Sequence, residues 1–364
     1  MGRLTMNKIS IEQLLYSNFI KYDRMKDLTL EAFRNSNANH VNVYIDMYTM
    51  LLGIYEDNVL IEDYSCITSS IVNLCAHIRQ YYKSRHGVTT TIYIIYSEPG
   101  NSNQNIFYHG YNEVNRNKVA SNKKKYDMVL ANIELLSLLC PYLYDIFFIY
   151  KGNYEPSVIM LDIMCRNEAN KNNAPNIVIS KSIYAYQLPA VKENTVLFRP
   201  KKKSGEDMSW LITPRNIFGE YITRVKQCKP DNGYYVANFI NSRLFSVILA
   251  LTGVKDRNIK SIINIKQAIN LIWKGIESNL ILNDYNSDLA FLFNAINHDQ
   301  KINMASVTFE HRFKAIDLIF QHSVYMESPA SKDYSSIVNL FDDNAVREIN
   351  DKYFRNNPLD LNSL

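Results

Sequence analysis

Apolar and polar positions along the chain follow a pattern that predicts a mixed α/β fold. Short apolar runs rich in β-branched and aromatic residues are typical of buried parallel strands. These runs are Val41–Ile45, Val88–Tyr96, Asp145–Tyr150 and Asn176–Ser180. Segments with helical apolar spacing lie between them, at Cys66–Lys83, Tyr126–Leu139 and Ser157–Cys165. Repeated strand–loop–helix units of this kind predict a parallel sheet flanked by helices.

The pattern changes beyond about residue 190, where helical spacing dominates. Val196–Phe198 and Trp210–Thr213 are candidate short strands, and the polar stretch Asn101–Lys125 is interpreted as a loop. Two longer helices are predicted at Tyr235–Leu251 and Ile262–Ile276. We therefore expect an α/β domain over residues 1–213 and a helical region over residues 214–364.

Composition places the chain among ordinary globular proteins. Hydrophobic residues make up 47% and charged residues 21% of the 364 positions, and no apolar run has the length of a membrane span. The N-terminal residues lack the apolar core of a secretion signal. The five cysteines are scattered without zinc-binding spacing, which predicts reduced thiols. We expect an intracellular protein in a reducing, cytoplasmic-type compartment, and association with a virus particle is compatible with this.

The charge balance is mild, because 40 basic and 36 acidic residues leave a net charge of +4. This excludes a strongly basic nucleic-acid module, yet basic residues gather in two polar segments. They are either solvated surface or contacts to phosphate groups. The candidate nucleic-acid-binding residues are Arg116, Lys118, Lys123, Lys124, Lys125, Lys201, Lys202 and Lys203. The excess of Asn, Ile, Lys and Tyr is typical of AT-rich codon usage and favours a virus-encoded protein.

Three acidic residues lie at the ends of predicted strands. Asp46 ends the first strand, Glu98 follows the second, and Glu155 follows the third. Ligands of parallel α/β sheets bind at the carboxyl ends of the strands, so these carboxylates lie at the edge where chemistry is expected. The alternative is that they act as helix caps or hydrogen-bond acceptors. Asp162 is expected to be a solvated or capping residue, and the seven histidines show no metal-binding spacing.

Three further segments follow in a definite order, namely Tyr154–Val158, Ile177–Leu188 and Gly253–Ile259. Together with Asp46 and Glu98, they resemble in order and spacing the motifs of the flap endonuclease and 5′-nuclease family, a branch of the PIN-like folds. The resemblance extends from about Lys8 to about Ile276. It implies a parallel sheet that carries a two-metal nuclease site. It also implies a helix-hairpin-helix DNA clamp over about residues 244–276.

The chain departs from this family where the metal ligands should lie. Two-metal hydrolysis uses a cluster of carboxylates around two ions about 4 Å apart. The family's acidic positions carry other residues in this chain: Ser157, Val158, Ser182, Tyr184, Val254 and Arg257. The acids that remain, Asp46, Glu98 and Glu155, suffice for one loosely held ion. Asp256 is displaced by one residue, and Ile262–Ala268 lacks the glycines that bring backbone amides to DNA phosphate.

These departures lead to two main hypotheses. The first is a catalytically degenerate 5′-nuclease-like protein that binds DNA, RNA or a protein assembly and uses no cofactor. The second is a divergent metal-dependent 5′–3′ exonuclease or flap endonuclease that uses Mg²⁺ or Mn²⁺ at the reduced site. In a third, the likeness is accidental and the chain is simply an α/β protein. None of the three involves a membrane or a small-molecule cofactor. A salt bridge from Arg257 or Lys181 to the carboxylates would favour the first hypothesis.

Overall fold

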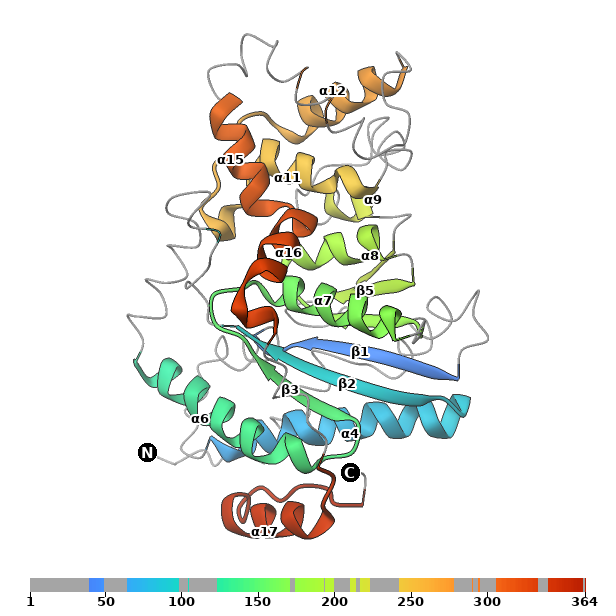
Figure 1. The fold of residues 1–364 in the computed structure, drawn as a ribbon, viewed down its shortest axis with the longest axis vertical. Helices are drawn as coiled ribbons and strands as arrows, with labels where there is room; N and C mark the ends of the chain where they lie inside the picture. The colour runs from blue at the N-terminus through green and yellow to red at the C-terminus, as the bar shows by residue number, and fades with distance from the viewer. Residues whose placement is uncertain are drawn as a thin grey trace, which may run out of the picture.

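A six-stranded sheet forms the centre of the molecule, with the strand order β3-β2-β1-β4-β5-β6 (Figure 1). The computed structural model describes residues 39–48, 64–97, 104, 123–170, 174–192, 194–199, 210–213, 217–222, 242–277, 290, 294, 306–332, 340–362 and 364. Strands β1 to β5 run parallel, and β6 pairs antiparallel with β5. The strands are β1 (His40–Asp46), β2 (Thr89–Tyr96), β3 (Ile146–Tyr150), β4 (Asn176–Ile179), β5 (Thr195–Arg199) and β6 (Trp210–Ile212).

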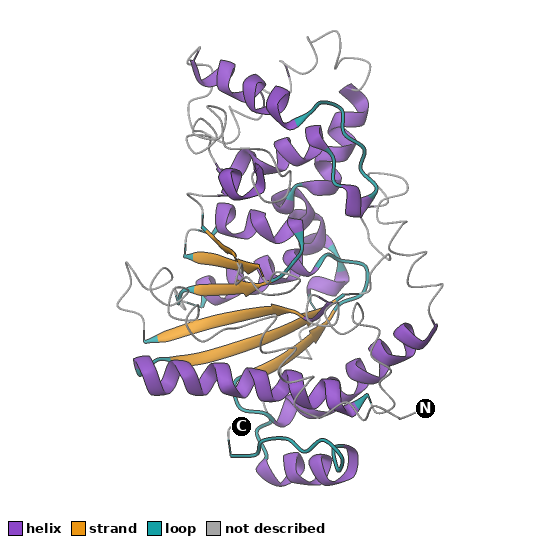
Figure 2. Cartoon of the chain, turned by 180° about the vertical axis from the view of Figure 1, so that it is seen from behind, coloured by secondary structure: helices purple, strands orange, loops and turns teal. Residues whose placement is uncertain are grey.

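Helices cover both faces of the sheet, as Figures 1 and 2 show from opposite sides. One face is covered by α4 (Ser65–His86) and α6 (Lys123–Leu139), with α17 (Asp343–Tyr353) packed beyond them. The other face is covered by α7 (Pro156–Ala169), α8 (Gln187–Val191) and α16 (Leu318–Glu327). This second layer continues into α9 (Ile217–Glu220), α11 (Phe245–Thr252), α12 (Ile265–Glu277) and α15 (Ser306–Ile316). Among the residues described, no helix is both long and apolar enough to cross a bilayer.

The side chains of the central strand β1 alternate between two buried cores. Val43 and Ile45 pack into the core under α4 and α6, whereas Tyr44 points into the core under α7. The Tyr44 ring stacks on Tyr93 of β2 with ring centroids 5.1 Å apart. Asn167 of α7 donates hydrogen bonds of 3.2 and 3.4 Å to the two tyrosine hydroxyl groups. The helix is thus held to the sheet by polar contacts inside an apolar layer.

The strands predicted from the apolar runs are confirmed by the structure, and the two candidate short strands are confirmed as β5 and the antiparallel β6. The expectation of a loop through Lys125 is wrong, because α6 begins at Lys123. Lysine is a good helix former, and this run leads directly into the apolar helical spacing that follows. The three lysines therefore lie in the first turn of a helix. The boundary between residues 213 and 214 stays a prediction.

The described residues of two predicted helices depart from the expected helix near its start. Within Tyr235–Leu251, the described residues Ser242–Leu244 form a 3₁₀ turn and α11 starts only at Phe245. Serine favours turns over helix interiors, which accounts for the break. Helix α12 begins at Ile265 because Asn264 and Gln267 exchange hydrogen bonds of 3.1 and 3.0 Å between side chains and backbone amides. Such a reciprocal cap fixes the start of a helix.

The four cysteines in the described part of the chain, Cys66, Cys75, Cys140 and Cys165, are free thiols. Burial in the core under α4 raises the pKa of the Cys75 thiol to about 12. An unfolded chain loses this proton near pH 8.5, whereas the folded chain keeps it. Between about pH 8.5 and about pH 12, unfolding therefore releases this proton. The free energy of unfolding must fall as the pH rises through that range.

We expect Cys75→Ala to flatten this alkaline loss of stability. One thiol contributes up to about 1.4 kcal/mol per pH unit to the slope of the unfolding free energy. Urea unfolding measured at several values above pH 8.5 should show a slope that is less steep in the variant, whatever its stability at neutral pH. Cys66→Ala, at a partly exposed thiol, is the control. The prediction would be contradicted if the unfolding free energy fell with pH equally steeply in wild type and Cys75→Ala.

Candidate functional site

Asp46 occupies the carboxyl end of the central strand, where the sequence predicts a ligand site. Its side chain is buried, and its Oδ2 accepts a hydrogen bond of 2.7 Å from the Ser180 hydroxyl. Ser180 follows β4, which runs parallel beside β1, so the two residues end neighbouring strands. The Ser180 Oγ in turn accepts a 3.0 Å hydrogen bond from the Ser182 backbone amide. The carboxylate is therefore tied to the loop that follows β4.

Glu155 precedes α7 at its N-cap position and is only 4% exposed. Its carboxylate makes two contacts with the Arg257 guanidinium, each of 2.9 Å: Nε to Oε1 and Nη2 to Oε2. The Nη2 contact has hydrogen-bond geometry, while the Nε contact is an ion pair without a well-directed hydrogen bond. This two-point arrangement suits a planar guanidinium, whose charge does not titrate in the physiological range.

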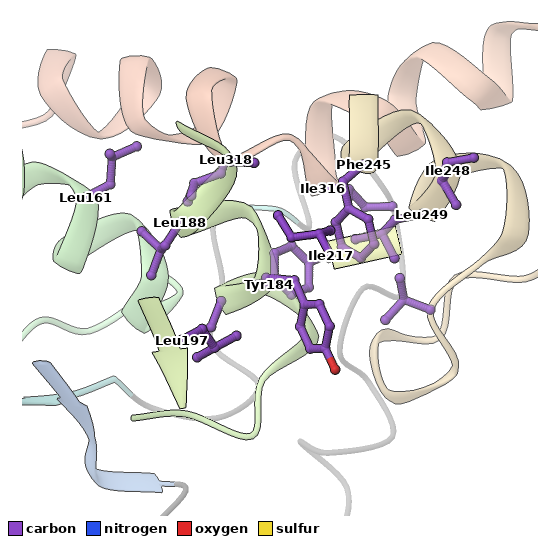
Figure 3. Close-up of a cluster of buried hydrophobic side chains, with 14 of the residues drawn as sticks. Leu161, Tyr184, Leu188, Leu197, Ile217, Phe245, Ile248, Leu249, Ile316 and Leu318 are labelled. Atoms are coloured by element: carbon purple, nitrogen blue, oxygen red, sulfur yellow. The ribbon is translucent and has the colours of Figure 1, made fainter. Parts of the chain in front are cut away.

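Tyr184 also contacts this guanidinium. The Arg257 Cζ stands over the Tyr184 ring at 5.5 Å from its centroid, a distance at which a cation is attracted to the ring face. The Tyr184 ring itself is buried in the apolar cluster that includes Leu188 and Phe245 (Figure 3). Arg257 therefore joins the carboxylate of α7 to the ring of a buried tyrosine.

A tight turn after α11 brings Arg257 to this place. Gly253 ends the helix with φ +71°, and a Cβ atom there would lie 2.5 Å from the Ile259 carbonyl oxygen. Only glycine fits such a position without displacing the backbone. Val254 and Ile259 close the turn with an antiparallel bridge, so the intervening residues form one rigid loop. The segment that resembles the family's glycine-aspartate turn thus carries an arginine toward the sheet.

The described residues at this edge fit an ion pair better than a pair of metal ions. Both Glu155 oxygens face the Arg257 guanidinium, and a divalent ion placed against them would meet that positive charge. Ser157 and Val158 are buried at positions where the family resemblance implies acids. Within the part of the chain that the structure describes, no three His, Cys, Asp or Glu side chains are grouped so as to hold a metal ion.

The remaining predicted site residues are placed only in part. Glu98 and the basic residues Arg116, Lys118, Lys201, Lys202 and Lys203 lie outside the described residues. Lys123, Lys124 and Lys125 form the first turn of α6. Because α6 joins the parallel strands β2 and β3, it must begin at the carboxyl edge of the sheet. This topology places the three lysines at the same edge as Asp46 and Glu155.

Asp162 is not the solvated or capping residue that its helix position predicts. Its carboxylate is 1% exposed and lies 2.9 Å from Arg166 Nε and 3.3 Å from His322 Nε2. Arg166 also donates a 2.8 Å hydrogen bond to the Ser331 carbonyl group beyond α16. A buried carboxylate requires such partners, and here they join α7 to α16.

The role of Ser180 was not predicted from the sequence either. A usable signal existed, because Ser180 and Asp46 follow neighbouring parallel strands and must meet at one edge. No such signal exists for His322, which is 160 residues from Asp162 and lies in another helix.

Known proteins match this chain in fold rather than in sequence. No protein-family model and no curated protein matches the sequence. Among solved structures, zinc-bound T5 5′-exonuclease superimposes with a TM-score of 0.52 at 14% identity, over 85% of this chain and 98% of that one. The chain has a PIN-like 5′-nuclease fold. A second T5 structure, co-crystallised with metal ions, superimposes over the same shares with a TM-score of 0.50 at 15% identity.

A third match is a flap endonuclease pseudo-enzyme of bacteriophage T5 in a product complex with DNA and metal ions. Its TM-score is 0.49 at 12% identity, over 85% of this chain and 97% of that one. The predicted fold class, a parallel sheet flanked by helices with a helical C-terminal region, is confirmed by the 5′-nuclease fold. The helix-hairpin-helix over about residues 244–276 stays a prediction.

We expect Arg257→Ala to destabilise this 5′-nuclease fold strongly. The substitution leaves the Glu155 carboxylate buried without its main counter-charge, which typically costs about 3–5 kcal/mol. Chemical denaturation measures the loss. Lys314→Ala removes a surface ion pair to Glu310 and should cost under about 1 kcal/mol. Adding Glu155→Gln should recover part of the loss in Arg257→Ala, because the unpaired charge is removed. A double variant no more stable than Arg257→Ala would contradict the pairing.

Proposed function

We propose that this protein is a catalytically degenerate member of the 5′-nuclease fold that works by binding nucleic acid rather than by cutting it. The observation that supports the proposal is the contact between Arg257 and both oxygens of Glu155. Two-metal hydrolysis depends on carboxylates that are open to divalent ions. In this protein the carboxylate at the start of α7 is already neutralised by a side chain of the same molecule.

The environment of the pair strengthens this argument. Glu155 is almost fully buried, and the Arg257 guanidinium contacts both its carboxylate and the Tyr184 ring. A metal ion would have to displace the guanidinium and leave a second cation nearby, which the low dielectric of the site makes costly. Asp46, for its part, accepts a hydrogen bond from Ser180. The site is therefore stabilised by internal contacts that need no ion.

Two observations support nucleic acid as the partner. The similar solved structures include a protein named as a 5′-exonuclease, and Lys123 to Lys125 begin a helix at the carboxyl edge of the sheet. Lysines neutralise backbone phosphates without reading sequence. DNA or RNA bound there would meet the positive end of the α6 dipole as well. If nucleic acid does not bind, the remaining proposal is that the protein is a structural component of a virus-encoded protein assembly.

A nuclease assay on a 5′-flap DNA substrate with Mn²⁺ tests the loss of catalysis. We expect wild type and Asp46→Ala to give the same background, since cutting by the 5′-nuclease route depends on the carboxylate at this position. Asp351→Ala, at an exposed position on α17, is the matched control. Cleavage by wild type and by the control, but not by Asp46→Ala, would overturn the proposal. That pattern would establish the alternative, a divergent metal-dependent flap endonuclease.

The proposed nucleic-acid binding is tested by measuring the affinity for single-stranded and duplex nucleic acid at several salt concentrations. Reversing Lys124 and Lys125 to Glu should weaken binding and lower the slope of log Kobs against log salt by about 0.9 for each phosphate that is no longer neutralised. Glutamates in a first helical turn suit the helix dipole, so α6 should persist. Reversing Lys83 and Arg85, exposed at the end of α4, changes the net charge equally and should have little effect. If both variants lost affinity equally, the nucleic-acid-binding site would not lie at the carboxyl edge of the sheet.

A further inference from the structure

Two arginines contact two tyrosine rings of a single 3₁₀ turn at the carboxyl edge of the sheet. The turn, Ile183–Tyr186, follows β4, where the family resemblance implies an acidic loop. Arg257 stands over the Tyr184 ring. Arg199, at the end of β5, stands over the Tyr186 ring with its Cζ 5.4 Å from the centroid. In place of metal ligands, this loop therefore carries the rings that contact two guanidinium groups.

Tyr186 orients the Arg199 side chain. Its ring is fully buried and stacks on Phe245 of α11, with the ring centroids 5.7 Å apart. Its hydroxyl group accepts a hydrogen bond of 2.9 Å from Arg199 Nη1. A guanidinium has five N–H donors in one plane, and this contact uses one of them. Arg199 is only partly buried, so a buried tyrosine orients a guanidinium that solvent can reach.

The strand register places Arg199 in a row with the acid of the candidate site. Asp46, Ser180 and Arg199 each follow a residue of one paired row across β1, β4 and β5. The residues two positions before them all lie in the core under α7, so the three side chains point to the same face. Ser180 lies between the other two and donates its hydroxyl hydrogen to Asp46. Neighbouring strands are about 4.8 Å apart, which puts the backbones of Asp46 and Arg199 about 10 Å apart.

We propose that Arg199 binds a backbone phosphate of the nucleic acid directly, without a metal ion between the protein and the phosphate. This inference rests on the proposed nucleic-acid binding and assigns one contact within it. In two-metal hydrolysis, divalent ions stabilise the charge of the phosphate. Arg199 supplies a fixed positive charge at the same edge, and the planar fork of a guanidinium matches two phosphate oxygens. The phosphate contact at this edge then needs no ion.

The neighbouring charges suit an anion at Arg199. The charge of Glu155 is already neutralised by Arg257. The Asp46 backbone lies about 10 Å away along the edge, which is on the order of one Debye length at physiological salt. Lys181, two residues beyond β4, is partly exposed and adds a positive charge on the strand beside Arg199. Together these side chains give this part of the edge a positive balance.

Fluorescence anisotropy with a labelled oligothymidylate, at several salt concentrations and in EDTA, tests the contact. Arg199→Ala should weaken binding about tenfold, because a charge-assisted hydrogen bond is lost. It should also lower the slope of log Kobs against log salt by about 0.7, the value for one phosphate of a single strand. Arg347→Ala, exposed on α17 beyond the opposite face of the sheet, removes the same charge and should change neither quantity.

Two conservative variants separate the contact from an effect on folding. Arg199→Lys keeps the charge but loses the planar fork, so it should keep the wild-type salt slope with a lower affinity. Tyr186→Phe keeps the buried ring and removes only the hydroxyl group that orients the guanidinium. It should likewise weaken binding at an unchanged salt slope. Thermal unfolding of each variant sets a temperature at which all of them are folded for the comparison.

The outcomes distinguish this inference from the proposed function. If Arg199→Ala binds with the affinity and salt slope of wild type, the contact is overturned while nucleic-acid binding stands. Wild-type binding that is lost in EDTA and returns with Mn²⁺ would also overturn the direct contact. A wild type that binds neither the oligothymidylate nor duplex DNA would overturn both.

Discussion

The buried charge of Glu155 is the constraint on which the carboxyl edge of the sheet depends. A carboxylate that is 4% exposed requires a nearby counter-charge, and the chain supplies it from Arg257, 102 residues further on. The contact joins the start of α7 to the turn after α11, and so joins the α/β layer to the helical C-terminal part. The rigid turn from Gly253 to Ile259 matters for the same reason, since it delivers the guanidinium.

The pair need not be a large source of stability. Buried ion pairs often stabilise a fold no more than well-packed apolar residues would, although breaking one is costly. What the pair does provide is specificity, because a guanidinium with two contact points and a ring beneath it accepts few other geometries. Asp162 repeats this arrangement on the same helix, where Arg166 and His322 join α7 to α16. Buried acids on α7 therefore act here as points of attachment for distant segments.

The sequence predicted most of the sheet, because parallel strands buried on both faces produce continuous apolar runs. It also placed Asp46 and Glu155 after strands at this edge and named Arg257 as a residue for a salt bridge there, and the structure shows that bridge to Glu155. It could not place Asp162, since an acid in the middle of a helix reveals nothing about a histidine 160 positions away. The lysines before Tyr126 were wrongly assigned to a loop. Polar residues in the first turn of a helix look like a loop when the apolar spacing that follows them is not considered. Local sequence patterns thus determine the helices and strands, whereas the candidate site depends on contacts between segments that are distant in the sequence.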